Sequence, residues 1–310
     1  MDRFDSRWDD DRDRTQSADR DWGGRSGRDA DHPRGGSERS PFTRDLDLPG
    51  GDERERVRVR GRDYDLDGAD TEALATIGAF RVVQVEDLRD ALEAGPSDAT
   101  HDQRTGRLQD EGLLERIPLD GRERDVVVLT DHGRELLEAH RLGRPDAPGQ
   151  AFYAGLRKPR ELSHDAQVYR AFRRAEERIR GQGGRVRRVV LDYELKRHYQ
   201  CFLQERNRGR ADSDGRPDRT AEEVAAWARQ HDLPYFDDCV HFPDARIEYE
   251  DAARDLRHED IEVVTPHYRG AHAAGAARSG FRRYGAGFGG RGGGGRGGRA
   301  RRGGLADELL

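Results

Sequence analysis

The stretch from Asp70 to His140 constrains the fold more than any other part of the chain. Apolar residues at helical spacing predict helices over 70–80 and 84–94, and Gly95-Pro96-Ser97 ends the second of them. A third helix is predicted over 99–111, and it is almost entirely polar. A polar helix between two apolar ones indicates that its outer face has a function.

Two apolar segments, 113–119 and 125–130, follow the polar helix. Asp120-Gly121 lies between them and is typical of a hairpin turn. Thr130 is a suitable N-cap for a closing helix. Three helices, a hairpin and a fourth helix occur in the order of a winged helix-turn-helix. In that fold the third helix enters the major groove of DNA, and the hairpin lies beside the phosphate backbone.

The expected DNA contacts follow from this placement. Arg and Gln side chains pair with base edges, and arginines at the hairpin tip suit phosphates. The residues predicted to bind DNA are His101, Gln103, Arg104, Arg107, Arg122 and Arg124. Carboxylates on the same helix weaken its positive field; they are Asp98, Asp102, Asp110 and Glu111. A winged helix that contacts only proteins is the alternative.

Composition limits how much of the chain can form a core. Of 310 residues, 38% are charged and 33% hydrophobic, which is too polar for one compact globule of this length. Residues 1–55, of mixed charge, and residues 282–310, rich in Gly and Arg, are therefore predicted to be disordered. Between them we expect a DNA-binding domain over 56–140, a linker over 141–155 and a second domain over 156–281. The formal net charge is −6, so nucleic-acid binding requires local basic patches.

The second domain mixes helical and strand patterns. Its predicted elements are a helix from 162 to 180, a strand over 186–195, helices over 196–208 and 221–231, strands over 244–250 and 259–265, and a small-residue helix over 270–280. This order is typical of a small α/β domain, so the whole chain is predicted to be α+β.

The C-terminal tail resembles the arginine-glycine-glycine boxes of nucleic-acid-binding proteins. Its repeated glycines keep the backbone flexible, and its arginines pair with phosphates and stack on bases. The arginines singled out are Arg291, Arg296, Arg299, Arg301 and Arg302. The resemblance implies non-specific binding of RNA or single-stranded DNA; a flexible, solubilising tail is the alternative.

Two carboxylates in the second domain have the spacing of a nuclease site. Pro243-Asp244 precedes one predicted strand and Glu262 lies in the next, which resembles the core of the PD-(D/E)xK nucleases. That resemblance implies that Asp244 and Glu262 are catalytic residues and Mg²⁺ ligands, with Glu176 or Glu177 as a further ligand. The expected lysine is replaced by Val264, as in a degenerate nuclease. The alternative is that both acids are ordinary turn and strand residues.

A second metal interpretation involves softer ligands. His198 and Cys201 form one pair, and Cys239 and His241 form another, so four ligands could build a structural zinc site. Their spacing matches no standard zinc finger. The alternative is ordinary histidines and unbound thiols.

The combination of these motifs resembles a known family. A winged helix, then Leu162-Ser-His-Asp-Ala-Gln-Val168, Pro243-Asp244 and Glu262-Val-Val-Thr265, is similar to the replication-relaxation family of plasmids and other mobile elements. The resemblance covers about 70–281 and excludes both tails. It implies DNA handling during replication or mobilisation, and a nuclease-like second domain.

Three functions remain open. The first is a DNA-binding protein of a bacterial plasmid or mobile element, with duplex DNA as its partner and an inactive nuclease-like domain. The second is a metal-dependent DNA endonuclease targeted by the winged helix, with Mg²⁺. The third is an RNA-associated protein that binds through its tail. Two cysteines and the lack of a long apolar stretch predict a cytoplasmic protein with no membrane partner. A homodimer is compatible with each.

Overall fold

Helices and strands alternate along the parts of the chain that the computed structural model describes. These parts are residues 40–91, 98–119, 125–143, 149–156, 162–208, 216–264 and 278–285. Both kinds of element contribute to the core, so the predicted α+β class is confirmed. Within these parts, no helix combines the length and apolar character needed to cross a bilayer.

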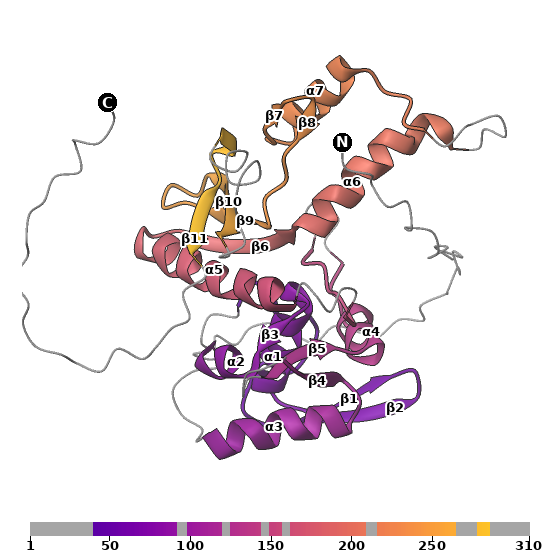
Figure 1. Cartoon of the computed structure of the whole chain (residues 1–310). Coiled ribbons are helices and arrows are strands. Elements are labelled where there is room, and N and C mark those ends of the chain that lie inside the picture. The colour runs from indigo at the N-terminus through magenta and orange to yellow at the C-terminus, as the bar shows by residue number, and fades with distance from the viewer. Residues whose placement is uncertain are drawn as a thin grey trace, which may run out of the picture. The chain divides into compact units, whose positions relative to one another are not determined.

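The first group of elements is built on a three-stranded antiparallel sheet with the order β3-β5-β4 (Figure 1). Its elements are α1 (Gly68–Phe80), β3 (Val83–Gln84), α2 (Val85–Ala91), α3 (Asp98–Asp110), β4 (Leu114–Pro118), β5 (Asp125–Leu129) and α4 (Asp131–Ala139). The predicted helices and hairpin strands are therefore confirmed within a few residues. Thr130 caps α4 as predicted, because its hydroxyl oxygen accepts a hydrogen bond from the Gly133 N–H at 3.1 Å.

Helix α1 begins in a capping box and ends in a strained turn. Asp67 is its N-cap, and the Asp67 and Asp70 side chains accept each other's backbone N–H at 2.8 and 3.1 Å. At the other end Arg81 has φ 64° and ψ −47°. The Val82 N–H donates to the Phe80 carbonyl oxygen at 2.7 Å, which closes a γ-turn that few non-glycine residues adopt.

A two-stranded ribbon precedes α1. It consists of β1 (Glu55–Val59) and β2 (Arg62–Leu66), joined by Arg60 and Gly61, both at positive φ, as a two-residue hairpin turn requires. Val57 and Tyr64 face each other on the buried side of the ribbon. The arginines that alternate with the valines in the sequence lie on the exposed side. The alternation of Arg and Val in the sequence thus follows the two faces of a strand.

The predicted tail over 1–55 is wrong for its last part. Phe42, Leu46 and Leu48 are each less than 7% exposed. The ring of Phe42 lies 5.5 Å from those of Phe80 and Phe172. Apolar residues that look isolated in a polar sequence thus fill the space between α1 and the second group of elements.

The segment predicted as a linker is also packed. Phe152 is 5% exposed, and the N–H groups of Tyr153 and Gly155 donate to the carbonyls of Gly78 and Leu129, each at 2.8 Å. A Pro/Gly-rich composition predicted a free connection. Instead, the described residues 149–156 run along α1 and β5, to which the N–H groups of Tyr153 and Gly155 are bonded.

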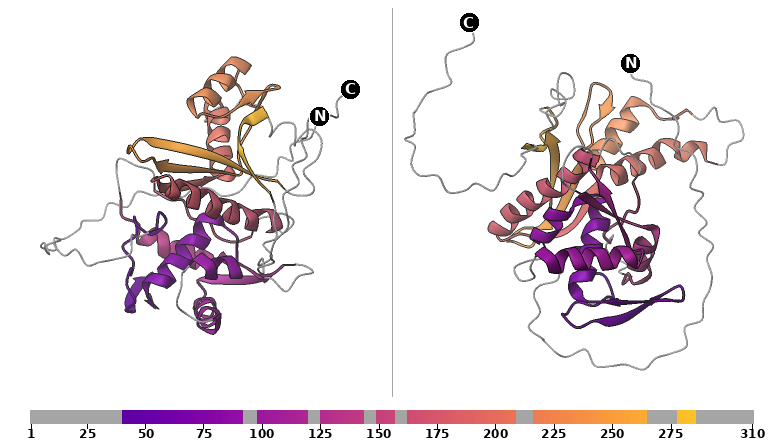
Figure 2. Two further views of the ribbon diagram at one scale, coloured as in Figure 1. Left: turned by 90° about the vertical axis from the view of Figure 1, so that its left-hand side faces the viewer. Right: turned by 60° about the horizontal axis from the view of Figure 1, so that its bottom comes forward.

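The second group of elements is built on a four-stranded sheet with the order β11-β10-β9-β6, which is antiparallel except that β11 runs parallel to β10. Its strands are β6 (Arg185–Leu191), β9 (Ala245–Glu250), β10 (Leu256–Val264) and β11 (Arg282–Gly285). Helix α5 (Leu162–Gly181) lies across one face of this sheet (Figure 2). Residues 282–285, predicted to belong to the disordered tail, are therefore a strand.

A smaller cluster covers the other face of the sheet near Val190. It contains α6 (Asp192–Gln204), the short 3-10 helix η2 (Glu205–Asn207), α7 (Ala221–Gln230), β7 (Tyr235–Phe236) and β8 (Cys239–Val240). Trp227 is buried at its centre. The sequence prediction extended the strand to Leu195, but the helix starts at Asp192. Leu195 is consequently buried in this cluster. The helix predicted over 270–280 lies largely outside the described residues.

The outer edge of β6 is covered by side chains from the first group. The Gln150 amide donates to the Val189 carbonyl and accepts from the Val189 N–H, both at 2.9 Å. Arg44 donates to the carbonyl of Arg187 on the same strand. Gln150 therefore pairs with β6 in the way a residue of a neighbouring strand would.

A half-buried carboxyl group lies where α1 meets α5. Glu72 accepts hydrogen bonds from the hydroxyls of Thr43 and Thr76 at 3.2 and 3.4 Å. Burial raises the pKa of Glu72 above its ordinary value of 4.5, although these hydroxyls and the charge of Arg173 act in the opposite direction. Native protein therefore binds more protons than unfolded chain just above pH 4.5, and stability falls as pH rises through the raised pKa.

We predict that Glu72→Gln removes this loss. Urea unfolding of the wild type should show a free energy that decreases as pH rises from 4.5 toward neutrality, and the variant should show a smaller decrease because it has no charge to bury. Glu177→Gln on the exposed face of α5 is the matched control and should follow the wild type. Parallel pH profiles for wild type and Glu72→Gln would contradict the prediction.

Candidate nucleic-acid interface and carboxylate pair

The polar helix α3 turns its arginines toward α1. Arg104 donates through Nε to Asp70 at 3.0 Å and through a terminal nitrogen to Asp67 at 3.4 Å. Arg107 donates to Asp70 and to Glu111, the latter at 3.0 Å. The Asp70 side chain is completely buried, so its charge requires such partners.

These contacts engage two of the residues that were predicted to contact DNA bases. The side chains of Arg104 and Arg107 are only 15% and 23% exposed, and both are paired with acids. His101 is 3% exposed and lies on the inner side of the helix. Of the predicted contacts on α3, Gln103 is the one whose side chain is exposed. Arg122 and Arg124 of the hairpin tip lie outside the described residues.

The outer face of α3 is therefore polar without basic side chains among the residues that can be described. Its exposed members are Asp102, Gln103, Gln109 and Asp110. Gly106 lies between them, and a Cβ added there would meet no atom within 4 Å. The fold thus does not require glycine at this position, although glycine weakens a helix interior by roughly 1 kcal/mol relative to alanine.

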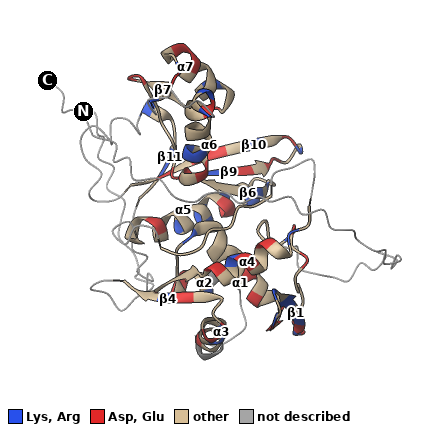
Figure 3. Ribbon diagram, turned by 90° about the vertical axis from the view of Figure 1, so that its right-hand side faces the viewer, with Lys and Arg blue, Asp and Glu red and all other residues tan. Residues whose placement is uncertain are grey.

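Exposed arginines lie instead on the β1–β2 ribbon beside α3, and this ribbon is largely blue, the colour of Lys and Arg, at β1 in Figure 3. The side chains of Arg56, Arg58 and Arg60 are 78%, 74% and 76% exposed. Arg56 and Arg58 share Asp63, and Arg60 pairs with Glu135 at 3.0 Å. We call these three residues the arginine ribbon. The alternation of Arg and Val places Arg56 and Arg58 on the face of β1 opposite its buried valines.

The ribbon is attached to α3. Arg107 donates through a terminal nitrogen to the backbone carbonyl of Asp65 in β2 at 3.1 Å. The same side chain therefore holds the C-terminal part of α3 against α1 and against the ribbon. Surface ion pairs such as those of the ribbon contribute little to stability, so their arginines can exchange carboxylates for phosphates at small cost.

The two acids of the predicted nuclease site occupy opposing positions at the end of the β9–β10 pair. Ile261 of β10 pairs with Ala245 of β9, and the Asp244 N–H donates to the Ile261 carbonyl at 3.0 Å. This register places Asp244 opposite Glu262, one position beyond the last residue of β9 that pairs with β10. Ile261 and Val263 pack toward α5, so Glu262 between them lies on the face of β10 away from α5. Glu262 is 9% exposed, so the pair lies at a largely buried position.

Asp244 is held by the protein itself. Its Oδ2 accepts the Val263 N–H at 2.7 Å and lies 3.3 Å from Nε2 of His164, near the start of α5. Nδ1 of His164 lies 3.5 Å from Asp165. Burial alone would lower the pKa of His164, but hydrogen bonds to Asp165 and Asp244 outweigh it and raise the pKa to about 10. The imidazole is therefore a cation at neutral pH.

The residues present do not fit the Mg²⁺ site that the nuclease resemblance implies. Glu176, a candidate third ligand, is turned to Arg173 at 2.9 Å, and burial raises its pKa, against the lowering effect of nearby arginines. Glu177 is exposed. In the part of the chain that the structure describes, no three His, Cys, Asp or Glu side chains are grouped for metal binding. A Mg²⁺ site of this kind is held by one or two carboxylates together with waters, and the Asp244 carboxylate is already bonded to the Val263 N–H and faces His164.

The zinc interpretation is contradicted by the same observation. His198 and Cys201 are exposed on α6, Cys239 is exposed in β8, and His241 stacks on Phe236 with ring centroids 3.7 Å apart. All four residues are described, and they do not form a group. Pairs of soft ligands in the sequence did not reveal that these side chains point to different surroundings.

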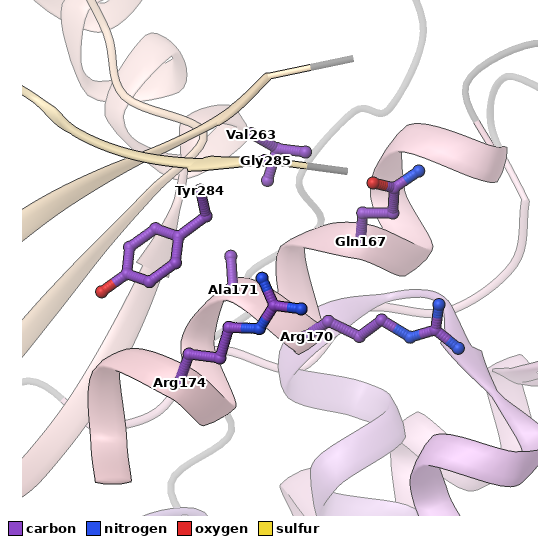
Figure 4. A pocket seen from close by; sticks show the side chains of 7 residues that line it. All are labelled: Gln167, Arg170, Ala171, Arg174, Val263, Tyr284 and Gly285. Carbon is purple, nitrogen blue, oxygen red and sulfur yellow. The ribbon is translucent and has the colours of Figure 1, made fainter. Parts of the chain in front are cut away.

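A small pocket between α5 and strands β10 and β11 has no chemistry of its own (Figure 4). It is lined by Gln167, Arg170, Ala171, Arg174, Val263, Tyr284 and Gly285. Arg170 is bonded away from it, to Asp87 at 2.6 Å and to Gln84. No carboxylate or imidazole is among the lining residues, so the pocket does not offer an acid and base pair.

The tail arginines predicted to bind nucleic acid, Arg291, Arg296, Arg299, Arg301 and Arg302, lie outside the described residues. The structure thus offers two regions of interest: the outer face of α3 with the arginine ribbon, and the Asp244 carboxylate with its partners His164 and the Val263 N–H. Comparison with known proteins connects neither region to a relative. No family model, curated protein or solved structure matches this chain.

Proposed function

We propose that the chain is a cytoplasmic DNA-binding protein that acts in replication or mobilisation of a bacterial plasmid or mobile element. In this proposal residues 68–139 form a winged helix that binds duplex DNA. The domain that follows is nuclease-like but does not cleave. The observation that carries the proposal is the exposed outer face of α3, flanked by the arginine ribbon.

The arrangement around α3 supports a winged helix. β3 lies between α1 and α2 and pairs with β5, so the helical segment and the β4–β5 hairpin share one sheet. α3 lies directly before this hairpin with its outer face exposed. A helix in this position can be presented to a major groove without rearrangement of the core.

The amides of α3 are the base-reading candidates, in place of the arginines expected from the sequence. A glutamine amide can form two hydrogen bonds to adenine, and Gln103 and Gln109 are both exposed. Gly106 between them lets the helix backbone approach a ligand closely. The acidic residues on the same face repel phosphates, so affinity must come from elsewhere, and the arginine ribbon provides exposed positive charge on strands bonded to α3.

The proposal predicts that changes on α3 alter the preference for one DNA sequence over another, whereas changes in the arginine ribbon alter the affinity for all duplexes. Duplexes selected from a random library by the full-length protein are the probe, and fluorescence anisotropy is the measurement. Gln103→Ala with Gln109→Ala should reduce the preference for the selected duplex over random DNA, by roughly 1–3 kcal/mol for each bidentate contact. Gly106→Leu should stabilise the fold, by roughly 1 kcal/mol, and yet weaken binding.

Two controls make the experiment specific. Gln200→Leu places an apolar side chain on the exposed face of α6 and should leave DNA binding unchanged. Replacing Arg56, Arg58 and Arg60 together by glutamine should weaken binding to all duplexes equally. It should also make the slope of log affinity against log salt concentration shallower, by about 0.9 for each lost phosphate contact. Unchanged preference in the double glutamine variant, or unchanged binding in Gly106→Leu, would rule out α3 as the reading helix.

A metal-dependent endonuclease is the second candidate function, favoured by the register that sets Asp244 opposite Glu262. The engaged state of Asp244 argues against it. Incubating supercoiled plasmid with the protein and Mg²⁺ or Mn²⁺ decides between the two: intact plasmid supports the proposal, and nicking that both Asp244→Asn and Glu262→Gln abolish would replace it.

A further inference from the structure

We propose that one side of α5, together with the edge strand β11, binds the phosphates of single-stranded nucleic acid. The surface consists of Arg170, Arg174 and Arg178 on the helix and Arg282 on the strand, and we call these four residues the basic stripe. The stripe lies on the second group of elements, apart from α3 and the arginine ribbon. The inference therefore goes beyond the duplex binding of the proposed function.

The three helical arginines of the stripe follow one another at intervals of four residues. Four residues advance an α-helix by about 6 Å and by slightly more than one turn, so these side chains lie in a line along one side of α5. Figure 4 shows Arg170 and Arg174 on this side of the helix, next to Tyr284 and Gly285 of β11. A line of guanidinium groups, one in each turn, suits the successive phosphates of one strand.

Strand β11 brings the fourth arginine to the same side. Arg282 pairs in register with Ile261 of β10, which is buried in the core between the sheet and α5. Arg282 therefore lies on the face of β11 that is turned toward α5, and its side chain is 51% exposed. Its Nε lies 3.6 Å from Glu259, which also accepts a hydrogen bond from Arg178. The shared carboxylate connects the strand to the helical part of the stripe.

The stripe carries more positive than negative charge. Arg170 is paired with Asp87 at 2.6 Å, and Glu259 is shared by two arginines of the stripe. Arg174 is exposed and forms no ion pair with another residue in the described part of the chain. Glu177 is exposed on the same helix, but the five arginines of α5 outnumber its three acids. The surplus positive charge is therefore available to an anionic ligand.

The pocket between α5 and β11 lies within the stripe and suits an anion. Its polar lining comes from the side chains of Gln167, Arg170, Arg174 and Tyr284. Amide and guanidinium N–H groups donate hydrogen bonds to phosphate oxygens. Among the described residues that line the pocket there is no carboxylate, which would repel a phosphate. The lining that offers no acid and base pair for a reaction thus favours the binding of an anion.

The sequence that follows β11 argues for a single-stranded ligand. The strand ends at Gly285, and arginines interspersed with glycines follow it between Arg291 and Arg302. Sequences of this kind bind single strands by pairing with phosphates and stacking on bases. The stripe and these arginines adjoin along the chain, so one strand can contact both. A single line of arginines also matches one backbone, whereas a duplex presents two.

The test is fluorescence anisotropy of labelled oligo-dT, oligo-U and a random duplex, titrated with the full-length protein at several salt concentrations. Arg174→Gln with Arg282→Gln should weaken the binding of single strands by roughly tenfold or more. The slope of log affinity against log salt concentration should become shallower by about 0.7 for each lost phosphate contact. The same pair of changes is also measured in a full-length protein whose arginines between 291 and 302 are all glutamine, which separates the stripe from the tail.

Glu259→Gln changes the affinity in the opposite direction. It releases Arg178 and Arg282 from their shared carboxylate, so single strands should bind severalfold more tightly, a gain that a folding defect would not produce. Arg197→Gln with Arg229→Gln is the matched control, because it removes the same charge from exposed positions on α6 and α7. This control should leave the binding of single strands unchanged. Circular dichroism and urea unfolding verify the fold of each variant.

Three results would overturn the proposal. They are unchanged single-strand binding in the double variant of the stripe in both backgrounds, an equal loss in the matched control, and no gain in Glu259→Gln. A loss of duplex binding without a loss of single-strand binding would also overturn it. Oligo-dT and oligo-U share the same phosphates, so a preference for one identifies the ligand as DNA or RNA and supports the stripe in either case. The α3 variants concern duplex preference, so the proposed function can fail without affecting this result.

Discussion

Asp70→Ala is expected to lower the free energy of unfolding by about 3–5 kcal/mol, because the guanidinium groups of Arg104 and Arg107 lose the buried carboxylate that they share. The Asp70 carboxylate is fully buried and accepts hydrogen bonds from Arg104, Arg107 and the backbone of Asp67. Its removal takes one acidic partner from each of two guanidinium groups and opens the capping box of α1. Urea denaturation followed by circular dichroism measures the effect.

Asp110→Ala is the matched control for this change. Asp110 is an exposed aspartate on the outer face of α3, and its removal should alter stability by no more than about 0.5 kcal/mol. If Asp70→Ala were as mild as Asp110→Ala, Arg104 and Arg107 would be free to turn outward. The base-reading role predicted for them from the sequence would then regain its support.

Phe42→Ala is expected to lower the free energy of unfolding by about 3–5 kcal/mol, as for other buried phenylalanines. Phe42 is 5% exposed and its ring contacts those of Phe80 and Phe172, on helices α1 and α5. Truncation would leave a cavity where the two groups of elements meet. The change should therefore reduce the stability of both, and one cooperative transition should shift to lower urea.

Leu142→Ala provides the comparison for Phe42. Leu142 is 47% exposed, so its truncation should have little effect on stability. A similarly small effect of Phe42→Ala would mean that residues before β1 are not part of the core, as the composition of this segment had predicted.

The sequence predicted best where apolar residues recur with a regular period. Helices α1 to α4 and the β4–β5 hairpin were located because their stripes, caps and turn residues agree with one another. The segment around Phe42 and the one around Phe152 have no such period. Their apolar residues are buried by contacts with distant elements, and tertiary contacts of this kind leave no local pattern.

The residues of the candidate sites also divide into those placed by local pairing, which the sequence predicts, and those placed by distant contacts, which it does not. The spacing of Asp244 and Glu262 follows from strand pairing, which is a local property of a hairpin, and so their opposition could be anticipated. The orientation of Arg104 and Arg107 could not, because it depends on the buried carboxylate of Asp70 on another helix. The contact of His164 with Asp244 depends on where α5 begins relative to β9, which only the assembled sheet defines.

The side chains that cover the outer edge of β6 have a consequence for folding during synthesis. An uncovered edge strand invites pairing with other chains, and such pairing is the first step of many aggregates. Gln150 and Arg44, which bond to β6, both precede it in the sequence. During synthesis from the N-terminus they have therefore left the ribosome before the strand they cover. The edge can be shielded as soon as it forms, without waiting for the later strands of its own sheet.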